Sequence, residues 1–215
     1  MTDHPGMSNL HVVLLSSGGL RSLVAAALTL HDADRVCLTL LHAIDGRDNA
    51  IVRLEHVRRQ AGYFNTTRIS ELDVPYLYGH SAGPEGMSIG TLVQPQLLLA
   101  AVSHARRQQA EQVVWPASFN GDANAMARAT EQMLLCEHLG DLEGPMPQVS
   151  APLLELTDQQ IVELGGQLEV PWRLAWSCLG QNETPCHACS ACHRRQAAFA
   201  EAGMLDGTAK PVHAS

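Results

Sequence analysis

Four cysteines near the end of the chain carry its clearest chemistry. The segment reads Cys-Leu-Gly-Gln-Asn-Glu-Thr-Pro-Cys-His-Ala-Cys-Ser-Ala-Cys, with thiols at Cys178, Cys186, Cys189 and Cys192. A C-x-x-C turn lets two thiolates converge on one ion, and a tetrahedral Zn²⁺ ion takes four such ligands at about 2.3 Å. We therefore predict a structural zinc site, because four thiolates leave no position for a catalytic water.

These thiols could also form disulfides or bind an iron–sulfur cluster. Disulfides between cysteines this close in sequence would close small, strained loops, and nothing else in the sequence is typical of secretion. An iron–sulfur cluster also binds four thiolates and stays open as the alternative. The first ten residues have no signal-peptide pattern, and no apolar run approaches the ~20 residues that cross a bilayer. We expect a cytoplasmic protein with no membrane segment.

A second candidate site is a serine–glycine turn. The run Leu14-Leu15-Ser16-Ser17-Gly18-Gly19-Leu20-Arg21-Ser22 follows an apolar stretch and opens an Ala/Leu-rich one. Paired glycines let the backbone approach an anion, and the N-terminus of a helix favours phosphate. The alternative is an ordinary tight turn between a strand and a helix, because the run is neither G-x-G-x-x-G nor a P-loop.

The elements that must position these residues alternate between two types. Apolar runs predict strands at 11–17, 35–43, 68–74 and 112–117, with a further extended piece at 152–156. Helical patterns cover 21–30, 49–63, 95–109, 122–138 and 157–168, and a short helix at 194–202. Such alternation predicts an α/β fold, a Rossmann-like parallel sheet of about five strands with helices on both faces. We expect a nucleotide-binding domain at 10–170, a zinc-binding lobe at 171–206 and a disordered tail at 207–215.

Charge limits the partners that the protein can have. The net charge is −8, and Lys210 is the only lysine. A protein that grips nucleic acid through its phosphates needs a basic surface, so we expect no direct nucleic-acid partner. Any phosphate contact in the body of the chain must come from arginine, histidine, backbone N–H groups or a metal ion.

Together the two sites resemble a known family. The run from Ser17 to Ser22 is similar to the S-G-G-x-D-S pyrophosphate-binding loop of adenylating ATP pyrophosphatases. From Ala151 onward the likeness is closer, through Ala-Pro-Leu-Leu-Glu-Leu-Thr, Ala-Trp-Ser-Cys and the cysteine run to Arg194-Arg195 and Phe199. The chain resembles the 7-cyano-7-deazaguanine synthases of queuosine biosynthesis.

This resemblance implies a fold, an activity and partners. The fold is that of the adenine nucleotide alpha hydrolases, with a PP-loop, and family members commonly form homodimers. The family uses ATP and Mg²⁺ to adenylate 7-carboxy-7-deazaguanine. Ammonia then gives an amide, and a second activation dehydrates the amide to the nitrile.

The resemblance also assigns roles to individual residues. Matched to cofactor binding are Ser16, Ser17, Gly18, Gly19, Ser22, Asp45 and Asn120; matched to catalysis are Arg21, Ser22 and Asp122; matched to zinc are the four cysteines.

Three departures accompany the likeness. Arg21 stands where the family loop has an aspartate, a lysine usual near Thr157 is absent, and a V-P-x-R-N motif is reduced to the segment 92–96. An acidic group at position 21 would help to hold Mg²⁺, whereas arginine could bind a phosphate directly or point outward.

Two functions therefore stay open. The first is an ATP-consuming ligase that passes the acyl group to ammonia or to a protein amine, as in relatives from antiphage operons. The second is a deazapurine- or nucleotide-binding protein, or a partner subunit, without turnover.

Overall fold

The fold is built around a five-stranded parallel sheet. The computed structural model describes residues 9–32, 35–44, 49–66, 68–73, 93–142 and 144–208. The strands are β1 (Leu10–Leu15), β2 (Val36–Ile44), β3 (Arg68–Asp73), β4 (Gln112–Val114) and β5 (Gln148–Ser150). Their order is β3-β2-β1-β4-β5, and every neighbouring pair is parallel. The predicted α/β fold is confirmed.

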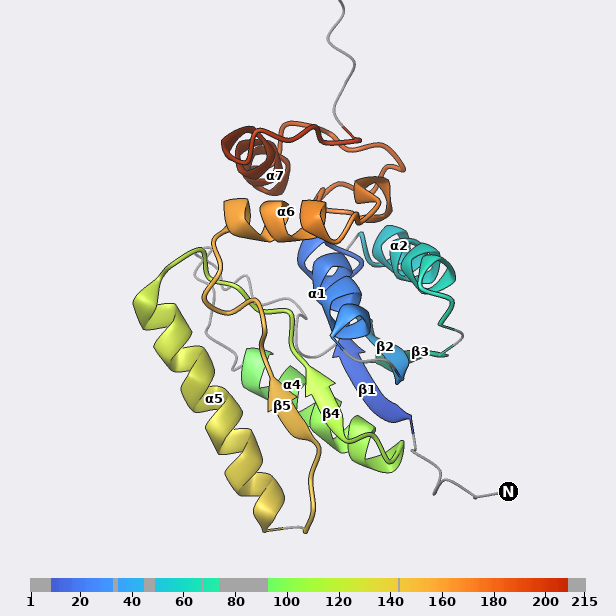
Figure 1. Cartoon of the computed structure of the whole chain (residues 1–215), viewed down its shortest axis with the longest axis vertical. Coiled ribbons are helices and arrows are strands. Elements are labelled where there is room, and N and C mark those ends of the chain that lie inside the picture. The colour runs from blue at the N-terminus through green and yellow to red at the C-terminus, as the bar shows by residue number, and fades with distance from the viewer. Residues whose placement is uncertain are drawn as a thin grey trace, which may run out of the picture.

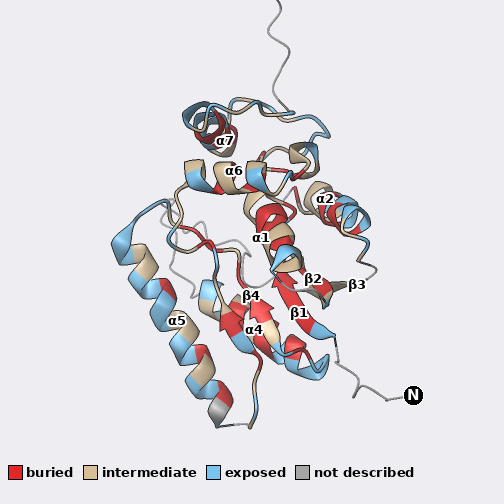
Figure 2. Cartoon of the chain, in the orientation of Figure 1, coloured by how far each residue is buried: buried red, intermediate tan, exposed pale blue. Residues whose placement is uncertain are grey.

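Helices cover both faces of this sheet. They are α1 (Leu20–His31), α2 (Ala50–Tyr63), α4 (Val93–Arg107), α5 (Ala123–Asp141), α6 (Asp158–Gln167) and α7 (Ser190–Glu201), with a 3₁₀ turn at Trp172–Leu174. Alternate residues of β1 point to opposite faces. Val12 and Leu14 therefore pack with α1, α2 and α6. Val13 and Leu15 pack with α4 and α5. Figure 2 shows this core as buried residues in the central strands and in α1.

The structure differs from the expected elements at several places. Strand β4 ends at Val114 instead of 117, and α4 spans Val93–Arg107 instead of 95–109. Residues 152–155 form turns instead of an extended piece, and the fifth strand is the three-residue β5 just before them. Pro152 has no N–H to donate to a strand neighbour, which favours a turn there. Helix α7 begins at Ser190, so Cys192 lies within the helix, earlier than the predicted start at 194.

A layer formed by α6 and α7 lies at the carboxyl ends of the strands. Figure 1 shows both helices beyond the tip of β1 and over the start of α1. In sheets of this topology ligands bind at that end, where the strand order reverses. Here the reversal falls between β1 and β4, which are neighbours although they are not consecutive in sequence.

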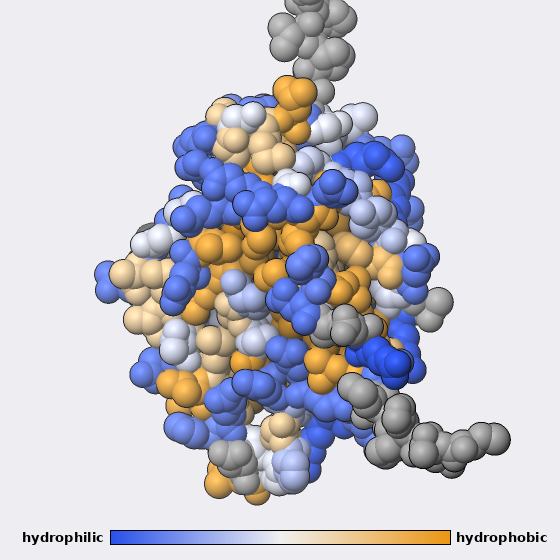
Figure 3. Space-filling view, viewed as in Figure 1, coloured by the Kyte–Doolittle hydropathy of each residue, from blue (hydrophilic) through white to orange (hydrophobic). Residues whose placement is uncertain are grey.

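The surface of the molecule is partly apolar. A band of apolar surface crosses the middle of the face seen in Figure 3, with hydrophilic surface on either side. None of the helices within the described ranges is both long and apolar enough to cross a membrane.

Candidate functional site

The serine–glycine turn joins β1 to α1 in a conformation that requires glycine. Gly18 has a φ of +70°, and a Cβ atom there would lie 2.6 Å from the Arg53 carbonyl oxygen. That approach is far below van der Waals contact, so no other residue fits. The turn therefore follows its sequence closely, as paired glycines predicted.

Serine hydroxyls hold the turn in shape. The Ser22 hydroxyl accepts a hydrogen bond from the Ser17 N–H at 3.0 Å and lies 3.2 Å from the Ser17 hydroxyl. The Ser16 hydroxyl accepts the Gly18 N–H at 3.3 Å, and the Ser17 hydroxyl accepts the Gly19 N–H at 3.4 Å. These last two contacts are long, so an incoming anion could take over both N–H groups at small cost.

The N-terminus of α1 adds a favourable field for an anion. Gly19 is the N-cap residue, no side chain caps the helix, and its first turn contains no acidic residue. The first N–H groups of a helix have no partner within it, and the helix dipole places about half a positive charge there. The turn has the properties of a phosphate cradle.

Arg21 lies beside this cradle and has defined partners. Its guanidinium donates to the Ser118 carbonyl oxygen at 2.7 Å and to Asp158 Oδ1 at 2.7 Å. Asp158 is the first residue of α6, next to Thr157. The cation at position 21 thus pairs with an anion at the start of α6. Sequence reasoning missed Asp158, because its only signal was a position at the start of a helix.

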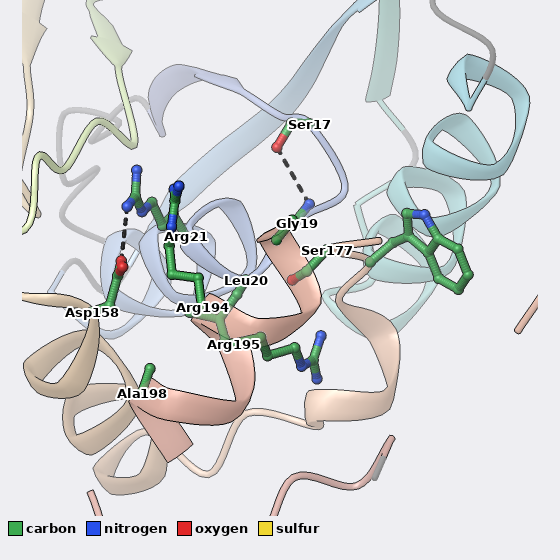
Figure 4. Close-up of a pocket in the computed structure, with 11 residues that line it drawn as sticks. Ser17, Gly19, Leu20, Arg21, Asp158, Ser177, Arg194, Arg195 and Ala198 are labelled. Atoms are coloured by element: carbon green, nitrogen blue, oxygen red, sulfur yellow. Dashed lines mark hydrogen bonds and ion pairs between the residues drawn. The ribbon is translucent and has the colours of Figure 1, made fainter. Parts of the chain in front are cut away.

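Two cavities adjoin the cradle and share Ser17 and Arg21. The first, of about 200 Å³, lies against α7 and is also lined by Asp158, Ser177 and Arg194. The second, of about 360 Å³, lies at the ends of β1, β2 and β4 and is lined by Leu15, Ala43, Trp115 and Phe119 among others. Figure 4 shows the first cavity with the Arg21–Asp158 ion pair at its wall. The second cavity occupies the point where the strand order reverses.

The cysteine lobe is bound directly to the cradle. The Trp176 N–H donates to the Gly18 carbonyl oxygen at 2.8 Å. Helix α2 reinforces this junction: Gln60 Nε2 donates to the Gly18 and Leu174 carbonyls, and Asn49 donates to the Cys178 carbonyl at 3.0 Å. Both side chains are buried. Sequence patterns did not indicate these contacts, which join positions between 42 and 158 residues apart.

The four cysteines form a compact cluster. Their sulfur atoms all lie within 4.8 Å of one another. Backbone N–H groups of Gly180 and Cys186 point at the Cys178 sulfur, at 3.2 Å and 3.3 Å. All six cysteines are free thiols in the structure. The cluster can therefore hold a metal ion, as the spacing predicted.

The pKa values of the thiols in this cluster differ. Burial raises the pKa of Cys192 to about 12, whereas hydrogen bonds from backbone groups, led by Leu179, outweigh burial at Cys189 and lower its pKa to about 6. A metal ion that binds all four thiolates would displace the remaining protons. Metal loading should accordingly release protons.

Two other predicted site residues, Asp122 and Asn120, have structural roles near the ends of helices. Asp122 is the N-cap of α5 and accepts the Ala125 N–H at 3.0 Å, and Asn120 Oδ1 accepts the Asp158 N–H at 2.9 Å. Neither lines the two cavities. Asp45 lies outside the described residues.

Within the described residues, no cluster of three or more carboxylates lies beside the cradle. Within the described ranges, the four cysteines are the one group of three or more His, Cys, Asp or Glu side chains spaced to hold a metal. Asp158, the carboxylate that lines the first cavity, is paired with Arg21. The described residues therefore fit a thiolate-bound ion, and no set of three or more carboxylates among them fits an ion beside the cradle.

Comparison with solved structures identifies the fold. The tRNA thiolase NcsA from Methanococcus maripaludis, solved with its 4Fe-4S cluster, superposes with a TM-score of 0.53 and 14% identity, over 89% of this chain and 65% of that one. A predicted subunit of a tRNA methyltransferase from Methanocaldococcus jannaschii gives a TM-score of 0.51 at 12% identity, over 95% and 94%. At these identities the likeness concerns the fold alone.

Comparison with sequences identifies relatives. A 7-cyano-7-deazaguanine synthase of Nostoc punctiforme is 45% identical over 64 residues, which are 30% of this chain and only 29% of that protein. Proteins of the same name from Methanospirillum hungatei and Anaeromyxobacter sp. are 26% and 29% identical, over 90% and 91% of this chain and 96% and 94% of theirs. The model of the family "Queuosine biosynthesis protein QueC" matches residues 96–203, half of the chain.

That match covers the Asn120 turn, α6, the four cysteines and α7, which are the segments assembled around the cradle. The chain belongs to the QueC family of queuosine biosynthesis proteins.

Proposed function

We propose that the protein adenylates 7-carboxy-7-deazaguanine, or a closely related deazapurine acid, with ATP and transfers the acyl group to an amine. The observation that carries this proposal is the junction of cradle and cysteine lobe: the Trp176 N–H bonded to the Gly18 carbonyl, with one cavity on each side of Arg21. The relatives named 7-cyano-7-deazaguanine synthase support the choice of substrate class.

In the proposed reaction, a carboxylate oxygen of the deazapurine attacks the α-phosphorus of ATP. The bond from that phosphorus to the bridging oxygen breaks, and pyrophosphate leaves with the electron pair. An amine nitrogen then attacks the acyl carbon, AMP leaves, and the nitrogen loses a proton. The chain's own contribution is positioning and charge: N–H groups of the cradle and the guanidinium of Arg21 bind the pyrophosphate as it departs.

The second cavity is the larger one and suits the nucleoside part of ATP. Apolar and aromatic side chains line it, and a purine can pack against them. The deazapurine carboxylate must approach the α-phosphorus from the side opposite the departing pyrophosphate, so the first cavity, toward the cysteine lobe, is left to the pyrophosphate. The lobe then forms a wall of the pyrophosphate site, and its metal ion has no direct part in the chemistry.

Zinc is the ion that we propose for the four cysteines. Thiolates at about 2.3 Å from a tetrahedral centre lie about 3.8 Å apart, close to the spacing of this cluster. In a 4Fe–4S cluster each thiolate binds a different iron, which separates the sulfurs more widely. We also keep as proposals a homodimer, a cytoplasmic location, and the division into units 10–170 and 171–206.

The acceptor amine decides the product. Ammonia leads to an amide and then, after a second activation, to the nitrile. With a protein amine the reaction stops at the amide conjugate, because the amide nitrogen carries a carbon substituent and no nitrile can form. A role in antiphage defence would be consistent with conjugation to a protein amine.

A second function has one specific observation in its favour. The Arg21 guanidinium is paired with Asp158, at a position where the family loop carries an aspartate. A chain so altered could bind a nucleotide or deazapurine as a scaffold without turning it over.

The test is pyrophosphate release from ATP by the zinc-loaded protein. We expect release that depends on 7-carboxy-7-deazaguanine, with the product mass measured in the presence of ammonia and, separately, of a peptide amine. A matched control omits the deazapurine. Tight deazapurine binding without pyrophosphate release would establish the scaffold function instead.

A further inference from the structure

The lining of the first cavity contains a positive charge beyond that of the Arg21–Asp158 ion pair. The lining includes three arginines, Arg21, Arg194 and Arg195, and one carboxylate, that of Asp158. Arg21 is paired with Asp158 and Arg195 with Asp206, so Arg194 leaves one cation in excess. The positive end of the α1 dipole adds to it, in a chain whose net charge is −8.

The neighbouring arginine in the sequence does not share this property. Arg195 is buried and binds Asp206 through two bonds of 2.7 Å and 2.8 Å, and it also donates to the Ala175 and Trp172 carbonyls. Figure 4 shows the Arg194 side chain extending toward Arg21, whereas Arg195 points away from that pair. Arg195 therefore has a structural role, and Arg194 is available to bind a ligand.

Arg21 and Arg194 keep unused donors. A guanidinium has five N–H groups, and Arg21 uses one to Ser118 and one to Asp158. Arg194 is exposed, and no ion pair or hydrogen bond joins it to another side chain within the described ranges. Two guanidinium groups that face one space, with N–H donors to spare, suit a ligand with several oxyanion oxygens.

The one carboxylate that lines this space is already paired with a cation of the protein. Asp158 is engaged by Arg21, and no group of metal-ligating carboxylates exists in the described part of the chain. A phosphate bound here therefore meets fixed cations of the protein.

We infer that Arg194 and Arg21 form a phosphate-binding arginine pair, which neutralises the pyrophosphoryl end of the nucleotide without a carboxylate-bound magnesium ion. This inference rests on the proposed function for the identity of its ligand. Arg194 comes from the cysteine lobe and Arg21 from α1, so the phosphate is held between the two parts of the molecule.

The experiment measures inorganic pyrophosphate binding by calorimetry, with zinc-loaded protein in buffer freed of other divalent metals. We expect binding without added Mg²⁺ and a loss of about 10-fold or more in affinity for Arg194→Ala, as for removal of a charged hydrogen bond. Arg194→Lys should retain part of the affinity. Arg173→Ala, which removes an exposed arginine that lines neither cavity, is the matched control and should bind like the unaltered protein.

Wild-type affinity in Arg194→Ala, or binding only after Mg²⁺ is added, would overturn the inference. The pyrophosphate-release assay on the same preparations distinguishes failure of this inference from failure of the proposed function. Binding through Arg194 without turnover supports the arginine pair and rejects the ligase. Turnover that Arg194→Ala leaves unchanged supports the ligase and rejects the pair. Because Arg194 is exposed, its replacement should leave the thermal unfolding midpoint unchanged, which a melting curve checks.

Discussion

Arg21 shows how one residue sets the charge beside the candidate phosphate cradle. Its guanidinium is held 2.7 Å from Asp158, and both side chains are largely enclosed, with 31% and 14% of their surface exposed. The charges at these two positions are coupled, so neither can be inverted alone without bringing like charges together. The spacing of the sequence predicted the cradle, but not a contact between residues 137 positions apart.

This coupling gives a prediction for stability. Arg21→Asp places a second carboxylate beside Asp158 and should lower the free energy of unfolding by roughly 1–3 kcal/mol, since a charged hydrogen-bond partner is lost. The double variant Arg21→Asp/Asp158→Lys restores opposite charges and should recover at least half of that loss. Urea unfolding of the single and double variants measures both effects. Strictly additive losses would show that the two positions do not interact.

The same substitutions report on catalysis. If Arg21→Asp alone, or the double variant, raises pyrophosphate release, the inverted pair limits the reaction of the unaltered protein. A fall in both variants indicates that the Arg21 guanidinium itself takes part.

At the scale of elements, α2 links the two halves of the site. It presents Gln60 and His56 to the Leu174 carbonyl, while the His56 ring lies 5.2 Å from the Trp176 ring. Periodicity predicted α2 within a residue at its start and at the same end. It could not predict which partner the helix would cover, because buried polar contacts leave no hydrophobic pattern. The same limit applies to β5, whose three residues contain only one buried apolar side chain.

His56 makes the stability of this junction depend on pH. Burial lowers the pKa of His56 below its ordinary 6.5, with Arg59 and Arg195 acting in the same direction and the Leu174 carbonyl and Glu55 opposing them. When the pH falls below 6.5, the unfolded chain binds a proton that the folded chain resists, so the free energy of unfolding decreases.

The variant His56→Asn removes the titration and keeps a donor near the position of Nδ1. We expect the unaltered protein to lose more stability than this variant between pH 7.5 and roughly pH 5.5, a window set by the histidine pKa. Urea unfolding at three pH values checks it. Parallel losses in the two proteins would assign the pH dependence elsewhere, for example to His104, whose pKa burial also lowers.

At the scale of the molecule, the α/β layer and the cysteine lobe share one site. The lobe supplies Ser177 and Arg194 to the first cavity, and α1 supplies the cradle. Composition and motif order predicted both parts, because a thiolate cluster and a strand–turn–helix are local patterns. How the parts dock depends on long-range bonds such as Trp176 to Gly18, which no local pattern encodes.

Metal removal tests this shared architecture. Apart from the cysteines themselves, the lobe contributes only the buried Trp176 to the apolar cluster around them, and the neighbouring Val52 comes from α2, so the fold of the lobe should depend on the bound ion. We expect chelation to expose residues 171–206 to hydrogen exchange and to weaken pyrophosphate binding, while the sheet keeps its circular dichroism.

Cys186→Ser should reproduce the effects of chelation, since it removes one ligand of the cluster. Cys37→Ser, on β2 and outside the cluster, is the matched control and should retain one zinc ion per chain by elemental analysis. Iron in place of zinc would overturn the metal assignment. A lobe that stays protected from exchange without metal would show that contacts with α2 and the cradle, such as those of Asn49 and Gln60, hold it in place on their own.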